Sequence, residues 1–140
     1  MKVLVDTSAW VDFFNGFPSP ERQALANLIP SDHEICTCGL VVAEVFQGLR
    51  REEGRSRLSD LFREFTLLEP AGIDLYFRAA NLFRALRQRG TTIRSTIDCV
   101  IAVLAEEHRC ALLARDRDME MILQSGLLTV GSWPVEGLPS

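Results

Sequence analysis

The chain has 140 residues, a formal net charge of −4 at pH 7 and 47% hydrophobic residues. This length suits one domain, and the apolar content excludes a disordered chain. The acidic balance argues against a simple basic nucleic-acid-binding module, because such modules usually carry a net positive charge.

Short apolar runs alternate with helical patterns along the chain. The pattern predicts, in order, a strand at 2–5, helices at 8–14 and from Ser19-Pro20 to before Pro30, a strand at 34–37, helices at 40–49 and 53–65, a strand at 66–68, helices at 74–89 and 95–108, a strand at 111–114, a helix at 118–123 and an edge strand at 127–130. Such alternation is typical of an α/β domain with a mainly parallel central sheet and helices on both faces. We expect this domain to span residues 1–131, followed by a short C-terminal tail at 132–140.

Cysteine usage and hydropathy indicate the compartment. Cys36, Cys38, Cys99 and Cys110 form no Cys-x-x-Cys pair, which favours buried free thiols over a zinc site. An acid at position 6 comes too early for a signal peptide, and the apolar stretch at 97–105 is too short to span a membrane. We therefore expect a soluble, cytoplasmic protein without membrane contact.

Four acids stand at unusual places in this pattern. Asp6 follows the first predicted strand and Asp116 follows the strand at 111–114, where parallel sheets bind their ligands. Glu44 and Asp98 interrupt apolar helical runs, and a charge buried there needs a compensating partner. A divalent metal ion is an economical partner for several acids that meet at one site.

Each acid also has a purely structural explanation. The alternatives are a helix cap for Asp6, an ion pair with Arg50 or Arg51 for Glu44, a capping box with Ser95 for Asp98 and a turn for Asp116. The four acids together are harder to explain in this way.

The segments around the acids resemble the four motifs of the PIN-domain family, and more narrowly its VapC-type toxins, in the family's order. These segments are Asp6-Thr7-Ser8-Ala9-Trp10, Val41-Val42-Ala43-Glu44-Val45, Asp98-Cys99-Val100-Ile101-Ala102 and Arg115-Asp116-Arg117-Asp118. The resemblance extends from Met1 to about Val130. It departs at Ala114, where the family often has serine or threonine, and at Met119, where it often has phenylalanine. The fourth acid is therefore either Asp116 or Asp118.

The resemblance implies an endoribonuclease that depends on Mg²⁺ or Mn²⁺ and hydrolyses RNA phosphodiester bonds. Asp6, Glu44, Asp98 and Asp116 are then the catalytic and metal-binding residues, with Asp6 and Asp98 on the main ion, Glu44 in support and Asp116 at a second ion. Whether one or two ions bind is open. Thr7, Ser8 and Asp118 are possible secondary site residues.

The resemblance also implies partners: RNA as substrate, a cognate antitoxin protein of the VapB type, and a second copy of the chain in a homodimer. Two groups of arginines either contact an RNA backbone or are solvated helix residues: Arg50, Arg51, Arg55 and Arg57, and Arg84, Arg87, Arg89 and Arg94. The alternative function is a catalytically degraded PIN-like module that binds RNA or a protein, which Ala114 and Met119 slightly favour. The sequence does not indicate which RNA is cut.

Overall fold

A computed structural model describes residues 1–49, 52 and 54–135. The elements of these residues are β1 (Lys2–Val5), α1 (Thr7–Asn15), α2 (Pro20–Leu28), β2 (Glu34–Cys38), α3 (Gly39–Gln47), α4 (Arg55–Arg63), β3 (Thr66–Leu68), α5 (Asp74–Gln88), α6 (Thr96–Glu107), β4 (Ala111–Leu113) and α7 (Arg117–Gln124). The ends of the predicted elements differ from these by one or two residues, apart from the edge strand discussed below.

The four strands form one sheet in the order β3-β2-β1-β4, and every neighbouring pair is parallel. The central strand β1 is fully buried at Val3, Leu4 and Val5, which explains its unbroken apolar run. Parallel strands need crossover connections, and the helices supply them. The predicted α/β architecture with a parallel sheet is confirmed.

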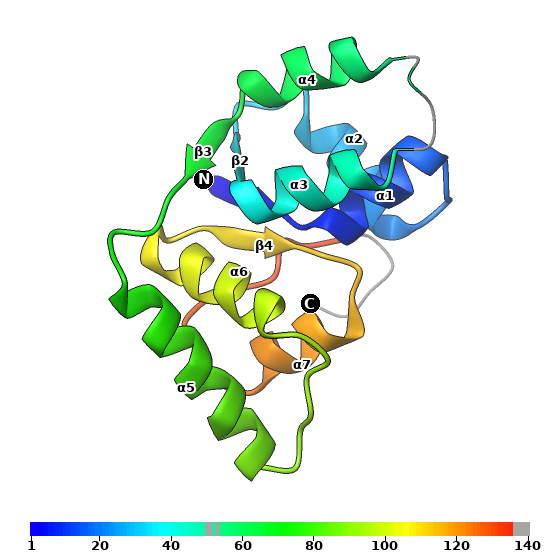
Figure 1. The fold of residues 1–140 in the computed structure, drawn as a ribbon. Coiled ribbons are helices and arrows are strands. Elements are labelled where there is room, and N and C mark those ends of the chain that lie inside the picture. The colour runs from blue at the N-terminus through cyan, green and yellow to red at the C-terminus, as the bar shows by residue number, and fades with distance from the viewer. Residues whose placement is uncertain (50–51, 53, 136–140) are drawn as a thin grey trace.

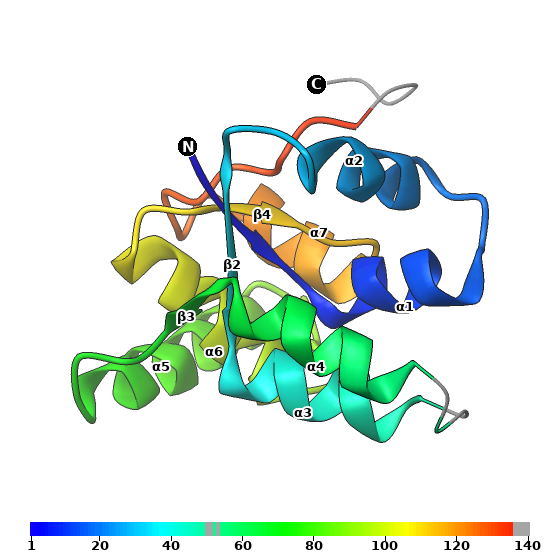
Figure 2. The ribbon, with the colours of Figure 1, turned by 90° about the horizontal axis from the view of Figure 1, so that it is seen from above.

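Helices cover both sides of the sheet. Figure 1 shows α5, α6 and α7 grouped on one side of β4, and α1 to α4 on the other side. The view from above in Figure 2 shows α5 alongside α6, in agreement with the close packing of these two helices. No described helix is long and apolar enough to cross a membrane.

Local signals in the sequence account for several of these elements. Ser19 caps α2, because its Oγ accepts a hydrogen bond from the backbone N–H of Arg22 at 3.1 Å, and Pro20 occupies the first helical turn as predicted. The Trp10 indole of α1 stacks on Phe14 and packs against Phe62 from α4. All four cysteines are buried and free, as expected.

The predicted edge strand at 127–130 is wrong. The backbone N–H and the hydroxyl of Thr129 donate to the carboxylate of Glu106 at the end of α6, and the segment 127–130 forms no strand. The pairing with β4 comes later, where Ser132 forms a parallel bridge with Leu112. The first residues of the expected tail therefore contact the sheet.

Candidate metal centre at the carboxyl edge of the sheet

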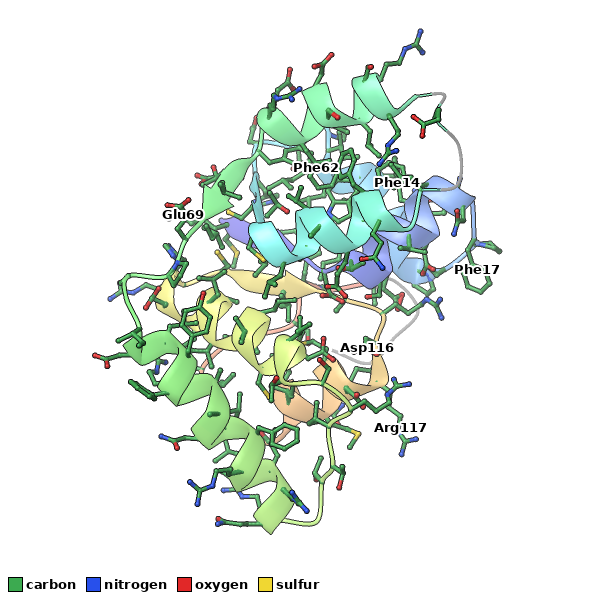
Figure 3. All side chains as sticks on the ribbon, in the orientation of Figure 1. Phe14, Phe17, Phe62, Glu69, Asp116 and Arg117 are labelled. Carbon is green, nitrogen blue, oxygen red and sulfur yellow. The ribbon has the colours of Figure 1, made fainter. Side chains whose placement is uncertain are left out.

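Two of the four predicted acids meet because β1 and β4 are parallel neighbours. Asp6 directly follows β1, and its backbone N–H donates to the carbonyl of Leu113, the last residue of β4, at 2.8 Å. Asp116 lies immediately before α7, and Figure 3 shows it beside the N-terminal end of α6. The carboxyl edge of the sheet thus brings together side chains that are far apart in sequence.

Asp98 joins this edge from the first turn of α6. One carboxylate oxygen each from Asp98, Asp116 and Asp118 lie within 4.8 Å of one another. Ser95 caps α6 by accepting from the backbone N–H of Ile97 at 3.1 Å. The Asp116 carboxylate lies close enough to Asp98 to raise its pKa.

Crowding of acids raises carboxyl pKa values at this edge. Burial, followed by the negative charges of Asp116 and Asp6, raises the pKa of Asp98 to about 7. Burial also raises the pKa of Asp6, although hydrogen bonds from Ser8 oppose this and the charge of Asp116 adds to it. The metal-free site therefore holds carboxyls whose ionised forms repel each other.

Asp118 differs from its neighbours because it is already bound. Its side chain is buried, and Oδ2 accepts hydrogen bonds from the backbone N–H of Arg94 at 3.0 Å and from its Nε at 3.1 Å. Burial alone would raise the pKa of Asp118, but these hydrogen bonds and the charge of Arg94 outweigh it and lower the pKa. Asp116 lies farther from that guanidinium, with 3.5 Å between Oδ1 and Nη2.

Glu44 was expected on a buried apolar face, and that expectation is wrong. The residue is exposed, because the buried positions of α3 are Val41 and Val45. Its Oε1 accepts a hydrogen bond from the Thr7 hydroxyl at 3.1 Å, which links it to the residue after Asp6. Glu44 is not among the three acids whose oxygens cluster. Its suggested partners Arg50 and Arg51 lie outside the described residues.

Ser8 connects Asp6 to the other side of the site. Its hydroxyl donates to Asp6 Oδ2 at 2.9 Å, and its backbone N–H donates to the same oxygen at 3.4 Å, so that Asp6 caps α1. The Ser8 hydroxyl in turn accepts from the backbone N–H of Arg115 at 2.9 Å. The cap predicted for Asp6 is thus present together with its place at the acidic edge.

Sequence reasoning missed Asp12, a buried carboxylate on α1. Arg115 donates hydrogen bonds from Nε and Nη2 to its two carboxylate oxygens, and the Ser19 hydroxyl donates to its Oδ2 at 2.8 Å. The Arg115 guanidinium also lies 4.7 Å from the centre of the Phe17 ring, at the outer end of the α1–α2 connection in Figure 3. The available signal was an acid inside an apolar helix, the same signal that singled out Asp98.

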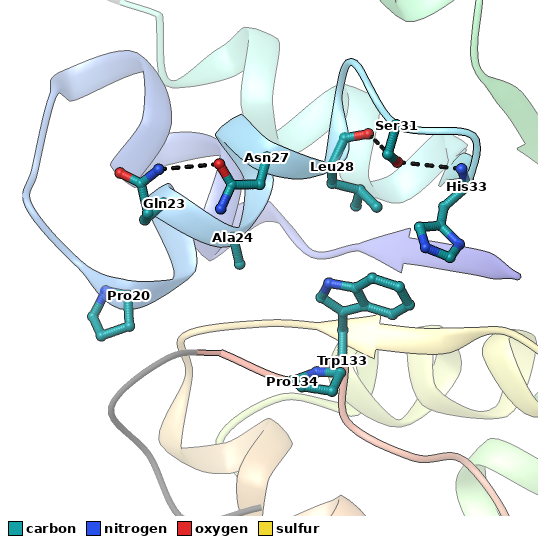
Figure 4. A pocket seen from close by; sticks show the side chains of 9 residues that line it. All are labelled: Pro20, Gln23, Ala24, Asn27, Leu28, Ser31, His33, Trp133 and Pro134. Atoms are coloured by element: carbon teal, nitrogen blue, oxygen red, sulfur yellow. Dashed lines mark hydrogen bonds between the residues drawn. The ribbon is translucent and has the colours of Figure 1, made fainter.

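A separate pocket of about 500 Å³ lies between α2 and the chain after Val130. Figure 4 shows the Trp133 ring turned toward His33, with 4.9 Å between the ring centres. The residues that line it are Pro20, Gln23, Ala24, Asn27, Leu28, Ser31, His33, Trp133 and Pro134. None of these carries a carboxylate, so this pocket does not supply the oxygen ligands of the acidic edge.

The acidic edge has the donor set of a site for a hard divalent cation. Its ligand atoms are carboxylate oxygens, which Mg²⁺ and Mn²⁺ prefer. Burial and the charges of Asp116 and Asp6 raise the pKa of Asp98, so a bound divalent cation would favour its ionised form. The residues present therefore fit a divalent metal ion.

Comparisons with known proteins agree with the fold. The sequence model of the PIN domain family matches residues 3–122. Two curated proteins, VapC ribonuclease Mb1587 of Mycobacterium bovis and Ribonuclease VapC11 of Mycobacterium tuberculosis, are each 30% identical over 132 residues, covering 94% of this chain and 98% of theirs.

Solved structures of similar fold come from toxin–antitoxin complexes. VapBC2 of Rickettsia felis, bound to a DNA fragment from its promoter, aligns with a TM-score of 0.69 and 21% identity over 96% of this chain and 100% of that chain. VapBC-1 of nontypeable Haemophilus influenzae aligns with a TM-score of 0.67 and 17% identity over 95% and 98% of the two chains.

A parallel sheet with acids gathered at its carboxyl edge defines an α/β domain of the nuclease type found in these relatives. The extent of the two sequence matches then decides the membership: the chain belongs to the PIN-domain family, and within it to the VapC proteins.

Proposed function

We propose that this chain is a divalent-metal-dependent endoribonuclease that hydrolyses phosphodiester bonds of RNA and acts as the toxin of a toxin–antitoxin pair. The observation that carries the proposal is the cluster of carboxylate oxygens from Asp98, Asp116 and Asp118 at the carboxyl edge of the sheet, where the pKa of Asp98 is raised to about 7 by burial and by the charges of Asp116 and Asp6. The curated relatives are named as VapC ribonucleases, which supports RNA as the substrate.

The residues that would hold Mg²⁺ or Mn²⁺ are Asp98 and Asp116, whose oxygens cluster, and Asp6, whose charge raises the pKa of Asp98. Glu44, held by Thr7, would support them. Asp116 suits this role better than Asp118, whose Oδ2 is already bound by Arg94. Such an ion supplies Lewis-acid stabilisation of the charge that develops on the phosphodiester during hydrolysis.

The chain's own residues prepare this site. Ser8 fixes the orientation of the Asp6 carboxylate by donating to one of its oxygens, which leaves the other oxygen free of that contact. The Thr7 hydroxyl holds Glu44 by donating to Oε1. Near neutral pH the carboxyl of Asp98 retains a proton for part of the time and must lose it before it can act as a ligand.

The family departures do not favour a degraded module. Met119 is fully buried, so the side chain that replaces the family's phenylalanine is part of the hydrophobic core. Ala114 is part-buried directly after β4, and alanine in place of serine or threonine removes no carboxylate. All four predicted acids are retained, which supports a working nuclease.

We further propose a VapB-type antitoxin as partner, a homodimeric state and action in the cytoplasm. The solved neighbours are toxin–antitoxin complexes, which supports the first of these. Light scattering of the purified chain, alone and after co-expression with the product of the neighbouring gene, measures both kinds of assembly. A monomer that no such product binds would refute both assemblies.

Cleavage of total cellular RNA by the antitoxin-free protein tests the enzymatic function. We expect discrete products with Mg²⁺ or Mn²⁺, and none with chelator or with Asp98→Asn. Intact RNA after incubation with folded, metal-loaded protein would refute the nuclease and leave the binding module. The pattern of products would identify the RNA that is cut.

A further inference from the structure

One arginine stands at the edge of the acidic site in an unusual geometry. Arg94 lies just before α6, and both its backbone N–H and its Nε donate to the same oxygen of Asp118. Its Nη2 lies 3.5 Å from Asp116 Oδ1. Among the ion pairs of the described residues, this guanidinium alone contacts the clustered acids.

The two partners differ sharply in exposure. The Asp118 side chain is 7% exposed, whereas the Arg94 side chain is 77% exposed. A buried carboxylate therefore anchors Nε, Nη2 lies near Asp116, and most of the Arg94 side chain is exposed to solvent. This is the arrangement of a side chain that is held in place for a ligand, since an exposed surface ion pair gains little by itself.

The charge of the site requires such a cation. RNA carries a negative charge at every phosphate, and the acids at this edge repel it. Because Nε binds Asp118 and Nη2 lies 3.5 Å from Asp116 Oδ1, Nη1 and the N–H of Nη2 that does not face Asp116 remain as donors for phosphate oxygens. Arginine suits this role because its planar fork matches the geometry of phosphate oxygens.

We propose that Arg94 is a phosphate-binding residue of this site and contacts the RNA backbone beside the acids, while Asp118 is the positioning residue that aims it. This inference rests on the proposed function and assigns Asp118 a role other than that of metal ligand. Arg94 then raises the affinity for RNA without belonging to the set of residues that hold the ion.

The first measurement is binding of a fluorescein-labelled, single-stranded 20-nucleotide RNA of mixed sequence, followed by anisotropy with Ca²⁺ in place of Mg²⁺. A gel of the same samples verifies that the RNA stays intact. We expect Arg94→Gln to raise the Kd about tenfold, the size of one lost charged contact. The slope of log Kd against log salt concentration should fall by about one, because one fewer counterion is released on binding. Arg94→Lys should restore part of the affinity.

Removal of Arg94 leaves a buried carboxylate without its partner, so the double variant Arg94→Gln/Asp118→Asn keeps the test valid if the single variant unfolds. The matched control is Arg78→Gln, which removes an arginine paired with Glu106 at the opposite end of α6. We expect its Kd for RNA to equal that of the wild type.

Steady-state cleavage of the same RNA with Mg²⁺ separates the two proposals. Wild-type cleavage with an unchanged KM and Kd in the Arg94 variants would overturn the role of Arg94 and leave the nuclease intact. RNA binding without cleavage by the wild type would refute the nuclease, and the anisotropy of the Arg94 variants would still decide their role. The Arg94 variants could also change only the midpoint temperature of thermal unfolding in the presence of Mn²⁺, with the Kd for RNA unchanged. Arg94 would then serve only to neutralise the acids, and the proposal would be overturned.

Discussion

Arg115 donates two hydrogen bonds to the Asp12 carboxylate and so links the segment after β4 to the middle of α1. The carboxylate is buried, and the guanidinium is about half exposed. The backbone N–H of Arg115 also binds Ser8, the residue that orients Asp6. Since Asp116 is the next residue in the chain, this pair fixes the two strand-end acids relative to each other.

Asp12→Asn tests whether this pair supports the site. We expect the free energy of unfolding to fall by about 1–3 kcal/mol, less than for a fully buried pair because solvent screens the exposed guanidinium. Urea denaturation measures this change. Asp60→Asn is the matched control, since Asp60 pairs with Arg63 on the surface of α4 and should matter by about 0.5 kcal/mol or less. Equal stability of the two variants would contradict the structural role of Asp12.

Ser8→Ala tests the link between Asp6 and β4. The change removes the hydroxyl that donates to Asp6 and accepts from the backbone of Arg115. We expect a loss of about 1–2 kcal/mol of stability and about a tenfold weaker Mn²⁺ affinity by calorimetry.

Ser59→Ala serves as the control for that experiment. Its hydroxyl donates to a backbone carbonyl within α4, remote from the acids. The Mn²⁺ affinity of this variant should equal that of the wild type. An unchanged affinity in Ser8→Ala as well would show that Ser8 is only a helix-start residue.

The stability of the metal-free protein should depend on pH through Asp98. A folded-state pKa of about 7, above the ordinary 3.8, means that the folded chain binds a proton which the unfolded chain has released. The contribution is fully present below pH 3.8 and is lost as the pH rises through about 7. At this part-buried carboxyl we expect the loss to be about 1–2 kcal/mol once solvent screening is allowed for.

Asp98→Asn isolates this contribution. The variant carries no titrating group at position 98, so its unfolding free energy in chelator should fall less between pH 5 and pH 8 than that of the wild type. Addition of Mn²⁺ should stabilise the wild type more at pH 8 than at pH 6, since the ion competes with the proton. If the free energies of unfolding of the two proteins changed with pH in parallel, the predicted contribution of Asp98 to the pH dependence would be wrong.

Much of the fold follows from local sequence signals. The near-continuous apolar run at 2–5 predicted a buried strand, and Ser19-Pro20 predicted the start of α2. The rule that parallel strands share a carboxyl edge was enough to predict that Asp6 and Asp116 meet. These inferences needed only the spacing of residues within a segment.

The rest depended on contacts between distant segments. Arg94 and Asp118 are 24 residues apart, and Arg115 and Asp12 are 103 apart, so no periodicity within one helix reveals either pair. The exposure of Glu44 had a similar cause, because the spacing of apolar residues in α3 does not tell which margin of the helix neighbours cover. Sequence patterns therefore located the acids but not the arginines that hold them.

The most direct test of the central claim is metal-dependent RNA cleavage by Asp6→Asn. Asparagine caps helices as well as aspartate does, so the start of α1 should survive while the charged ligand is lost. We predict that cleavage with saturating Mn²⁺ falls by about 100-fold or more, with thermal unfolding in chelator close to that of the wild type. Full metal-dependent cleavage by this variant would contradict the assignment of the acidic edge as the catalytic metal site.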